Sequence, residues 1–208
     1  MQEHTLTTAR TARYFTLGVP ERATDLWFVC HGYGQLAARF LERFGPLETS
    51  QRCVVAPEGL SRFYLSESPA ERRVGASWMT REDRLHEIDD YVRYLDAVYA
   101  DVAPGKHSVT ALGFSQGTAT VCRWAVLGTS RIDRLVLWGG EVPPDLDLER
   151  LRMPKLVLVY GTRDEFFTPK IVAATEARLR EHRLPYELVS FEGGHVLDVA
   201  ALSPLISA

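Results

Sequence analysis

Short apolar runs alternate along the chain with longer stretches in which apolar residues recur at helical spacing. The continuous apolar runs predict buried strands at residues 26–30, 53–56, 108–114, 135–138, 156–160 and 186–191. Helical spacing predicts helices at residues 35–48, 82–100, 170–183 and 196–205, and another that begins after residue 115. Because parallel neighbouring strands need a crossover connection, this alternation predicts an α/β fold with a mostly parallel central sheet and helices on both faces.

The segments between these elements indicate how the chain is organised. No repeat, low-complexity tract or linker divides it, so we expect residues 1–208 to form a single domain. Residues 12–17 are expected to add one or two antiparallel edge strands. Residues 57–80 lack clear periodicity and exceed the usual connection of about 4–6 residues, so we expect a loop that borders the active site; a plain surface loop is the alternative. The stretch 139–155 is too short for a helical lid, so no large cap domain is expected.

Composition and charge narrow the function classes. The formal net charge is −3 and no basic stripe is present, so nucleic-acid binding is not expected. No apolar segment approaches the roughly 20 residues of a membrane-spanning helix, and the N-terminal residues lack the apolar core of a signal peptide, so we expect a cytoplasmic protein. The cysteines are odd in number and scattered, which predicts buried free thiols rather than disulfides or a zinc site; they are Cys30, Cys53 and Cys122. No metal or cofactor is expected.

The first candidate for chemistry is Ser115, in the stretch Gly-Phe-Ser-Gln-Gly at residues 113–117. G-x-S-x-G between a strand and a helix is the tight turn that raises a serine hydroxyl above a sheet, at a helix N-terminus that favours developing negative charge. Apolar residues before the motif and a helical pattern after it supply that setting. We therefore expect Ser115 to be a nucleophile; an ordinary glycine-flanked strand-to-helix turn is the alternative.

A serine nucleophile needs a base, and the base needs a group that orients it. Among the six histidines, His195 follows the last predicted strand after two glycines, which selects it as the base. Asp164 follows the strand at 156–160 and is the expected orienting acid, with Glu165 and Asp198 as its nearest rivals. Ser115, Asp164 and His195 all come at the carboxyl ends of strands, where open α/β sheets collect their ligands.

The oxyanion of an acyl-transfer intermediate needs two backbone N–H donors. One should be the amide of Gln116, directly after the nucleophile. The other should come from the glycine-containing loop after the first predicted strand, His31-Gly-Tyr-Gly34, which makes the amide of Tyr33 the expected donor.

These motifs together resemble the α/β-hydrolase superfamily, and more closely its small phospholipase/carboxylesterase family, which includes the acyl-protein thioesterases. The resemblance rests on "HGYG" (31–34), "GFSQG" (113–117), "GTRDEFFTP" (161–169) and "GGH" (193–195). It implies Ser115 as nucleophile, His195 as base and Asp164 as orienting acid, with the amides of Tyr33 and Gln116 as oxyanion hole. It also implies cleavage of acyl esters or thioesters without cofactor or metal.

The expected activity is hydrolysis of carboxylic esters with small to medium acyl chains through an acyl-enzyme, in an open site without a cap. Besides Tyr33, the expected substrate-contacting residues are aromatic and lie in the 57–80 loop and the Asp164 motif: Phe63, Tyr64, Trp78, Phe166 and Phe167. The expected partner is therefore a small acyl ester, and a homodimer is left open. The alternatives are an acyl-protein thioesterase, lysophospholipase or small peptidase with the same triad, and a catalytically silent binding protein of the same fold.

Overall fold

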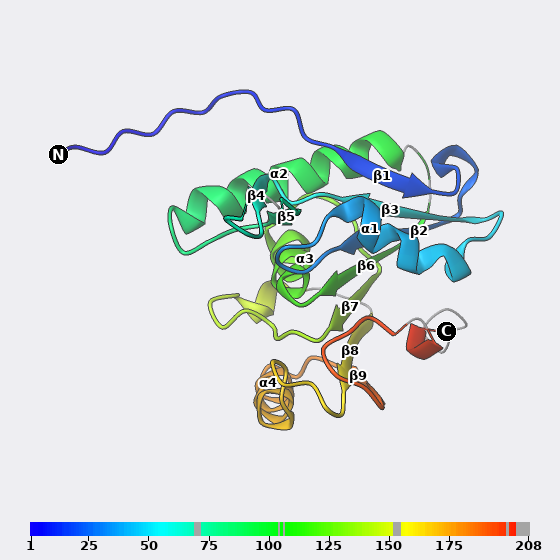
Figure 1. Ribbon diagram of the computed structural model, residues 1–208. Helices are drawn as coiled ribbons and strands as arrows, with labels where there is room; N and C mark the ends of the chain where they lie inside the picture. Colours follow the sequence, from blue (N-terminus) through cyan, green and yellow to red (C-terminus); the bar gives the residue numbers. More distant parts are fainter. Residues whose placement is uncertain (69–71, 104, 106, 152–154, 199, 203–208) are drawn as a thin grey trace.

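A computed structural model describes residues 1–68, 72–103, 105, 107–151, 155–198 and 200–202, and its centre is a seven-stranded sheet (Figure 1). The strands are β1 (Tyr14–Leu17), β2 (Asp25–Cys30), β3 (Arg52–Pro57), β6 (Ser108–Phe114), β7 (Arg134–Trp138), β8 (Lys155–Gly161) and β9 (Glu187–Phe191). Their spatial order is β1-β3-β2-β6-β7-β8-β9; β1 pairs antiparallel with β3 and all other pairs are parallel. The six predicted strands are confirmed to within one residue, and the N-terminal segment supplies one antiparallel edge strand.

Helices cover both faces of the sheet, as the side-chain alternation of β2 shows. Leu26 and Phe28 pack in one buried cluster, whereas Trp27 and Val29 pack in the other. The first cluster lies under α2 (Arg84–Val102), α3 (Gln116–Leu127) and α4 (Pro169–Glu181); the second lies under α1 (Ala37–Leu41), η2 (Glu42–Leu47) and η5 (Ala200–Leu202). Short 3₁₀ turns also occur at η1 (Pro20–Arg22) and η4 (Leu148–Arg150).

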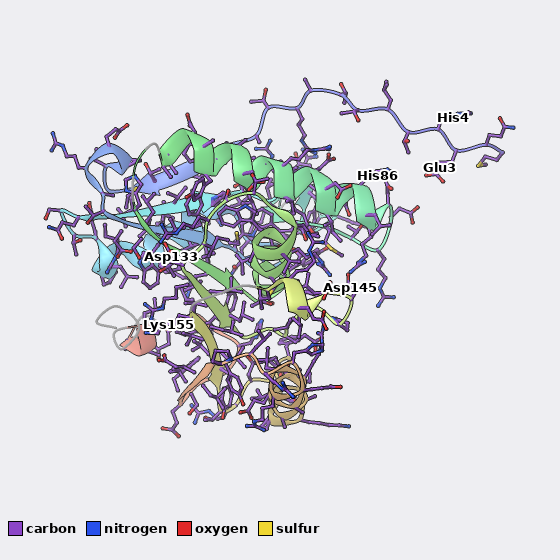
Figure 2. All side chains as sticks on the ribbon, turned by 180° about the vertical axis from the view of Figure 1, so that it is seen from behind. Glu3, His4, His86, Asp133, Asp145 and Lys155 are labelled. Carbon is purple, nitrogen blue, oxygen red and sulfur yellow. The ribbon has the colours of Figure 1, made fainter. Side chains whose placement is uncertain are left out.

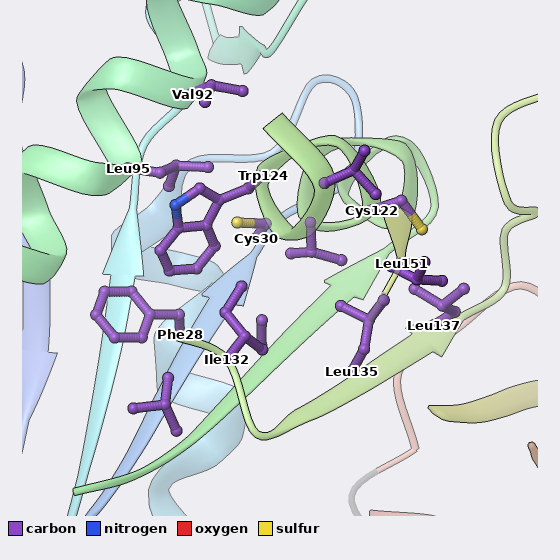
Figure 3. Close-up of a cluster of buried hydrophobic side chains, with 14 of the residues drawn as sticks. Phe28, Cys30, Val92, Leu95, Cys122, Trp124, Ile132, Leu135, Leu137 and Leu151 are labelled. Atoms are coloured by element: carbon purple, nitrogen blue, oxygen red, sulfur yellow. The ribbon is translucent and has the colours of Figure 1, made fainter. Parts of the chain in front are cut away.

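The cluster between the sheet, α2 and α3 fixes the helix that follows the candidate nucleophile (Figure 3). Trp124 of α3 is fully buried and meets Phe28 of β2 edge-on, with ring centroids 5.1 Å apart. Its indole N–H donates to Asp96 of α2 at 2.8 Å, so the polar edge of this large side chain is also satisfied. Truncating a buried tryptophan to alanine typically lowers the free energy of unfolding by about 3–5 kcal/mol, so Trp124 holds α3 firmly on the sheet.

The connection at 57–80 differs from the irregular loop that its lack of periodicity predicts. It forms a two-stranded antiparallel hairpin, β4 (Ser61–Tyr64) and β5 (Val74–Ser77). Each strand has only four residues, and β5 is made of small residues, so neither is long enough to show a clear alternation of apolar and polar side chains.

The prediction of a helix at 196–205 is also wrong for most of the residues that the structure describes there. Of these, only Ala200–Leu202 forms a helical turn, and it is a 3₁₀ turn. The backbone of Val196 is engaged elsewhere, since its N–H donates to Gly194 O and its carbonyl accepts from the indole of Trp138. Residue 199 and residues 203–205 of the expected helix lie outside the described residues.

Two further expectations can be compared with the fold. Only η4 lies among the described residues between β7 and β8, and the chain has no large cap domain. All three cysteines are buried free thiols, which confirms that prediction. No helix in the described ranges is both long and apolar enough to cross a membrane.

Candidate active site

Ser115 occupies a strained turn between β6 and α3. Its φ of 54° and ψ of −117° lie outside the regions that side-chain-bearing residues normally adopt, as in a nucleophile elbow. The flanking glycines permit the turn: a Cβ on Gly117 would lie 2.1 Å from the carbonyl oxygen of Cys30, and one on Gly113 would lie 2.2 Å from that of Gly117. The Ser115 N–H donates to Trp138 O at 2.9 Å, which ties the turn to the end of β7.

His195 and Asp164 form the pair that the sequence predicts. The imidazole Nδ1 and the carboxylate Oδ2 are 2.8 Å apart. The other oxygen of Asp164 accepts the backbone N–H groups of Phe166 and Phe167, both at 2.8 Å, and its side chain is only 2% exposed. Because an ionised carboxylate can only accept, Nδ1 carries the imidazole proton and Nε2 keeps the lone pair that a general base requires.

His195 lies above the same sheet edge as Ser115. Its ring packs on Phe114, the residue before the serine, with centroids 5.0 Å apart, and its Cε1 comes within 3.2 Å of where a Cβ on Gly139 would be. In the described ranges no hydrogen bond joins the Ser115 hydroxyl to His195. Catalytic hydrogen bonds are often long before substrate binds and tighten in the Michaelis complex.

The rival acids do not reach the histidine in this way. Glu165 is exposed, and Asp198 accepts the N–H of Ala200 instead. Asp164 is thus the carboxylate that the structure brings to His195.

The two predicted oxyanion donors come from two separate segments that both approach Ser115. Gln116 begins α3, and the loop of Tyr33 follows β2, where the backbone at Gly32 comes close to the Ser115 side chain: an added Cβ there would be 3.2 Å from Ser115 Cβ. Among the residues that the structure describes, neither the Tyr33 N–H nor the Gln116 N–H has a hydrogen-bond partner. Both amides therefore remain able to donate to a substrate oxygen.

His31 has a structural role that the sequence did not suggest. It is fully buried; its Nε2 accepts the N–H of Gly59 at 3.0 Å, so its Nδ1 must donate to Gly32 O, 2.8 Å away. Burial lowers the pKa of this imidazole, only partly offset by the Gly32 carbonyl and the nearby Glu58 carboxylate. Neutral His31 thus links the Tyr33 loop to the start of the hairpin connection; only its place in the glycine motif could have pointed to it.

The predicted substrate-contacting aromatics divide into two groups. Tyr33, Tyr64 and Phe166 are 61%, 62% and 72% exposed; Phe63 packs on Tyr33, and Phe166 packs on His195 with centroids 4.9 Å apart. Trp78 and Phe167, in contrast, are 1% and 2% exposed, so the expectation that they form walls of an open site does not hold. The buried indole of Trp78 donates to His31 O at 2.9 Å, and the backbone N–H of Phe167 donates to the buried Asp164 carboxylate.

A hollow of about 270 Å³ lies beside Gln116. Its polar wall is an ion-pair chain in which Asp145 accepts from Arg84 at 2.7 Å and from the buried Arg123 at 3.1 Å. Figure 2 places Asp145 on the opposite side of the molecule from Asp133 and Lys155, which lie at the amino ends of β7 and β8. The hollow therefore lies at the same end of the sheet as Ser115. Among the described residues no group of three or more His, Cys, Asp or Glu side chains is placed to hold a metal ion.

Comparison with known proteins agrees with this architecture. The α/β-hydrolase fold family matches residues 29–188. Acyl-protein thioesterase 2 of Zea mays has a similar structure, with a TM-score of 0.75 and 15% identity over 95% of this chain and 97% of that one. Esterase PE8 has a TM-score of 0.70 and 18% identity over 95% of this chain and 97% of that one. A phospholipase/carboxylesterase of Dyadobacter fermentans has a TM-score of 0.68 and 15% identity over 97% of this chain and 98% of that one. No curated protein matches the chain.

The chain belongs to the α/β-hydrolase family. The family supports hydrolase chemistry in general, and the structural neighbours, at 15–18% identity, show the same fold.

Proposed function

We propose that the protein is a serine hydrolase that cleaves carboxylic esters of small to medium acyl chain length. The observation that carries this proposal is the His195–Asp164 pair, joined at 2.8 Å, above the sheet edge where Ser115 stands in its strained turn. A carboxylate that is buried, bonded to two backbone N–H groups and aimed at an imidazole has no need to be there for stability alone, because burying a charge costs free energy. The arrangement suits a base held in one tautomer.

The reaction follows from these positions. Ser115 Oγ attacks the ester carbonyl carbon while Nε2 of His195 accepts the hydroxyl proton, and the carbonyl oxygen becomes an oxyanion that receives the N–H groups of Tyr33 and Gln116. The C–O bond to the alcohol breaks, and His195 gives its proton to the departing oxygen. Water then attacks the acyl-enzyme with His195 again as base, and the acid leaves as Ser115 regains its proton.

The surroundings of Ser115 support a small or medium acyl group. Tyr33, Tyr64 and Phe166 are exposed aromatic side chains, Phe166 packs on His195, and the chain has no large cap domain. The hollow of about 270 Å³ beside Gln116 offers room for an extension of the substrate. Selectivity between neighbouring chain lengths should be modest, since one methylene is worth about 1–3 kcal/mol.

The rival activities share the triad and differ in substrate. One structural neighbour is an acyl-protein thioesterase and another is a phospholipase/carboxylesterase, which keeps thioesters and lysophospholipids as alternatives. The alternative from another functional class is a catalytically silent binding protein of the same fold. The intact pair of His195 and Asp164, and the two unengaged amides, favour an enzyme.

Hydrolysis of p-nitrophenyl esters from acetate to palmitate tests the proposal. The matched set is wild type, Ser115→Ala and Ser68→Ala, the last a serine at the exposed end of the hairpin. Turnover by wild type and Ser68→Ala, with loss in Ser115→Ala, is the expected result, and the best chain length measures the acyl site. An optimum at long chains would favour the lipid or acyl-protein alternatives. Equal turnover by all three proteins would refute Ser115 as the nucleophile, and no turnover by any would favour the silent binder.

A further inference from the structure

The hairpin strand β5 is bonded to both halves of the predicted oxyanion hole. On one side, Gly34 N–H donates to Ala76 O at 2.9 Å and Ala76 N–H donates to Gln35 O at 3.1 Å, which joins the Tyr33 loop to β5. Two residues after Ala76, the indole of Trp78 donates to His31 O at 2.9 Å, at the start of the same loop.

The other half is reached through the side chain of Gln116. Its Oε1 accepts the backbone N–H of Trp78 at 3.1 Å, and its Nε2 donates to Met79 O at 2.8 Å and to Ser77 Oγ at 3.1 Å. The Ser77 hydroxyl in turn donates to Met79 O at 2.9 Å. Ser77 and Trp78 are each only 1% exposed, so these bonds lie out of bulk water, where their loss is costly.

The segment Ser77–Met79 is therefore a bridge between two loops that come from distant parts of the chain. The Tyr33 amide follows β2, and the Gln116 amide begins α3; apart from their packing around Ser115, the hairpin connects them by direct hydrogen bonds. Two donors help an oxyanion only if both reach one oxygen, within about 2.7–3.1 Å of each. A displacement of either loop by a few tenths of an ångström would weaken this pairing.

We propose that the side chain of Gln116 is a positioning residue for the reaction: by clamping Ser77–Met79, it fixes its own N–H relative to the N–H of Tyr33. The inference rests on the proposed function, because it assigns how that oxyanion hole is held together. It also gives the hairpin a role other than forming a wall for the acyl chain, and it explains why the residue after the nucleophile carries a long amide rather than any residue with an N–H.

The two roles of the hairpin predict different kinetics. If the hairpin sets the donor geometry, damage to the clamp slows the step in which the oxyanion forms, so kcat falls by the same factor for every acyl chain, while KM stays nearly constant. If the hairpin only contacts the acyl chain, damage changes KM and depends on chain length.

The test compares wild type with Gln116→Met, which keeps the backbone N–H and approximate size of the side chain but removes the amide. Trp78→Phe damages the clamp on the Tyr33 side, and Glu67→Gln is the control, at the exposed end of the same hairpin. Steady-state kinetics are measured on p-nitrophenyl acetate, butyrate and octanoate, with inhibition by an alkyl trifluoromethyl ketone, whose adduct with the serine carries the oxyanion. Urea unfolding confirms that each variant is folded.

We expect a fall in kcat of about 10–100-fold for Gln116→Met, less than the 10²–10³-fold that loss of a whole donor typically causes. The factor should be equal for the three esters, with KM within about twofold, and the ketone should bind more weakly by the factor lost in kcat/KM. Trp78→Phe should show the same pattern at smaller size and Glu67→Gln should match wild type. If Gln116→Met proves unfolded, Trp78→Phe carries the same test.

Unchanged kcat in the folded clamp variants, or a loss confined to KM and graded with chain length, would overturn the inference. In either case wild-type turnover that disappears in Ser115→Ala would leave the proposed function standing. Wild type inactive on all three esters would instead remove the proposed function, and the inference with it.

Discussion

Replacing Gly117 with alanine is the sharpest test of how the nucleophile turn is held. A Cβ at this position would lie 2.1 Å from Cys30 O, 2.8 Å from Cys30 C and 2.9 Å from His31 O, whereas ordinary contact begins near 3.4 Å. All three atoms belong to the backbone at the end of β2, so no side chain can rotate away. Either α3 must move from the sheet or the end of β2 must move, and that end carries the Tyr33 loop.

The magnitude follows from two opposed effects. Alanine is favoured over glycine in a helix interior by up to about 1 kcal/mol, which would stabilise α3. Overpacking in a well-packed interior costs about 1–3 kcal/mol, and a clash with rigid backbone lies at the upper end of that range. We expect a net loss of about 2 kcal/mol in the free energy of unfolding, or about 4–8 °C in Tm for a chain of this size.

The assay is urea unfolding of wild type, Gly117→Ala and the control Gly45→Ala, with ester hydrolysis measured on each. Gly45 lies in η2, and no atom lies within 4 Å of a Cβ added there, so its variant should stay within about 0.5 kcal/mol of wild type. Gly117→Ala should also lose kcat, because the clash moves one side of the proposed oxyanion hole. If Gly117→Ala is as stable as wild type or more so, and as active, the close approach of α3 to β2 is not what fixes the turn.

Three further predictions follow from the site. Asp164→Asn should lower kcat by as much as about 10⁴-fold, because an amide can no longer hold the base in the required tautomer; Glu165→Gln, which alters an exposed neighbouring carboxylate, should have little effect in the same kinetic assay. Trp138→Phe removes the indole donor to a carbonyl of the loop that carries the base, and should lower the free energy of unfolding by about 1 kcal/mol in urea, together with kcat. The free energy of unfolding should fall as pH drops from about 6.5 to 5, by at most about 1.4 kcal/mol per pH unit. The reason is that burial lowers the pKa of His31 in the folded state, so the unfolded chain binds a proton at this histidine at a higher pH than the folded chain does. His31→Asn should flatten that dependence of the free energy of unfolding on pH. The comparison is made in a His86→Gln background, because the Asp83 carboxylate raises the pKa of exposed His86, and this histidine therefore stabilises the folded state as pH falls. An unchanged slope in His31→Asn would contradict the role given to His31.

The alternation of apolar and polar stretches was sufficient for the central strands of the sheet, because strands buried on both faces must be continuously apolar. The candidate catalytic residues could be located for a related reason. Ser115, Asp164 and His195 each follow a predicted strand, and parallel strands bring their carboxyl ends to one edge.

What the sequence could not supply depends on contacts between distant residues. The burial of Trp78 results from a bond to His31 O, 47 residues away, and no local pattern reports it. The hairpin escaped detection because its strands are four residues long. The C-terminal helical pattern gave way because Val196 is held by the indole of Trp138, a tertiary bond that outweighs local helical propensity.

The most direct test of the central claim is to treat the protein with a fluorophosphonate, which phosphonylates activated serines, and to locate the adduct by mass spectrometry of its peptides. We predict a single adduct on Ser115 in wild type, none in Ser115→Ala, and much slower labelling in Asp164→Asn, with all three proteins folded. Absence of an adduct in folded wild-type protein, or labelling of another serine that persists in Ser115→Ala, would contradict the account.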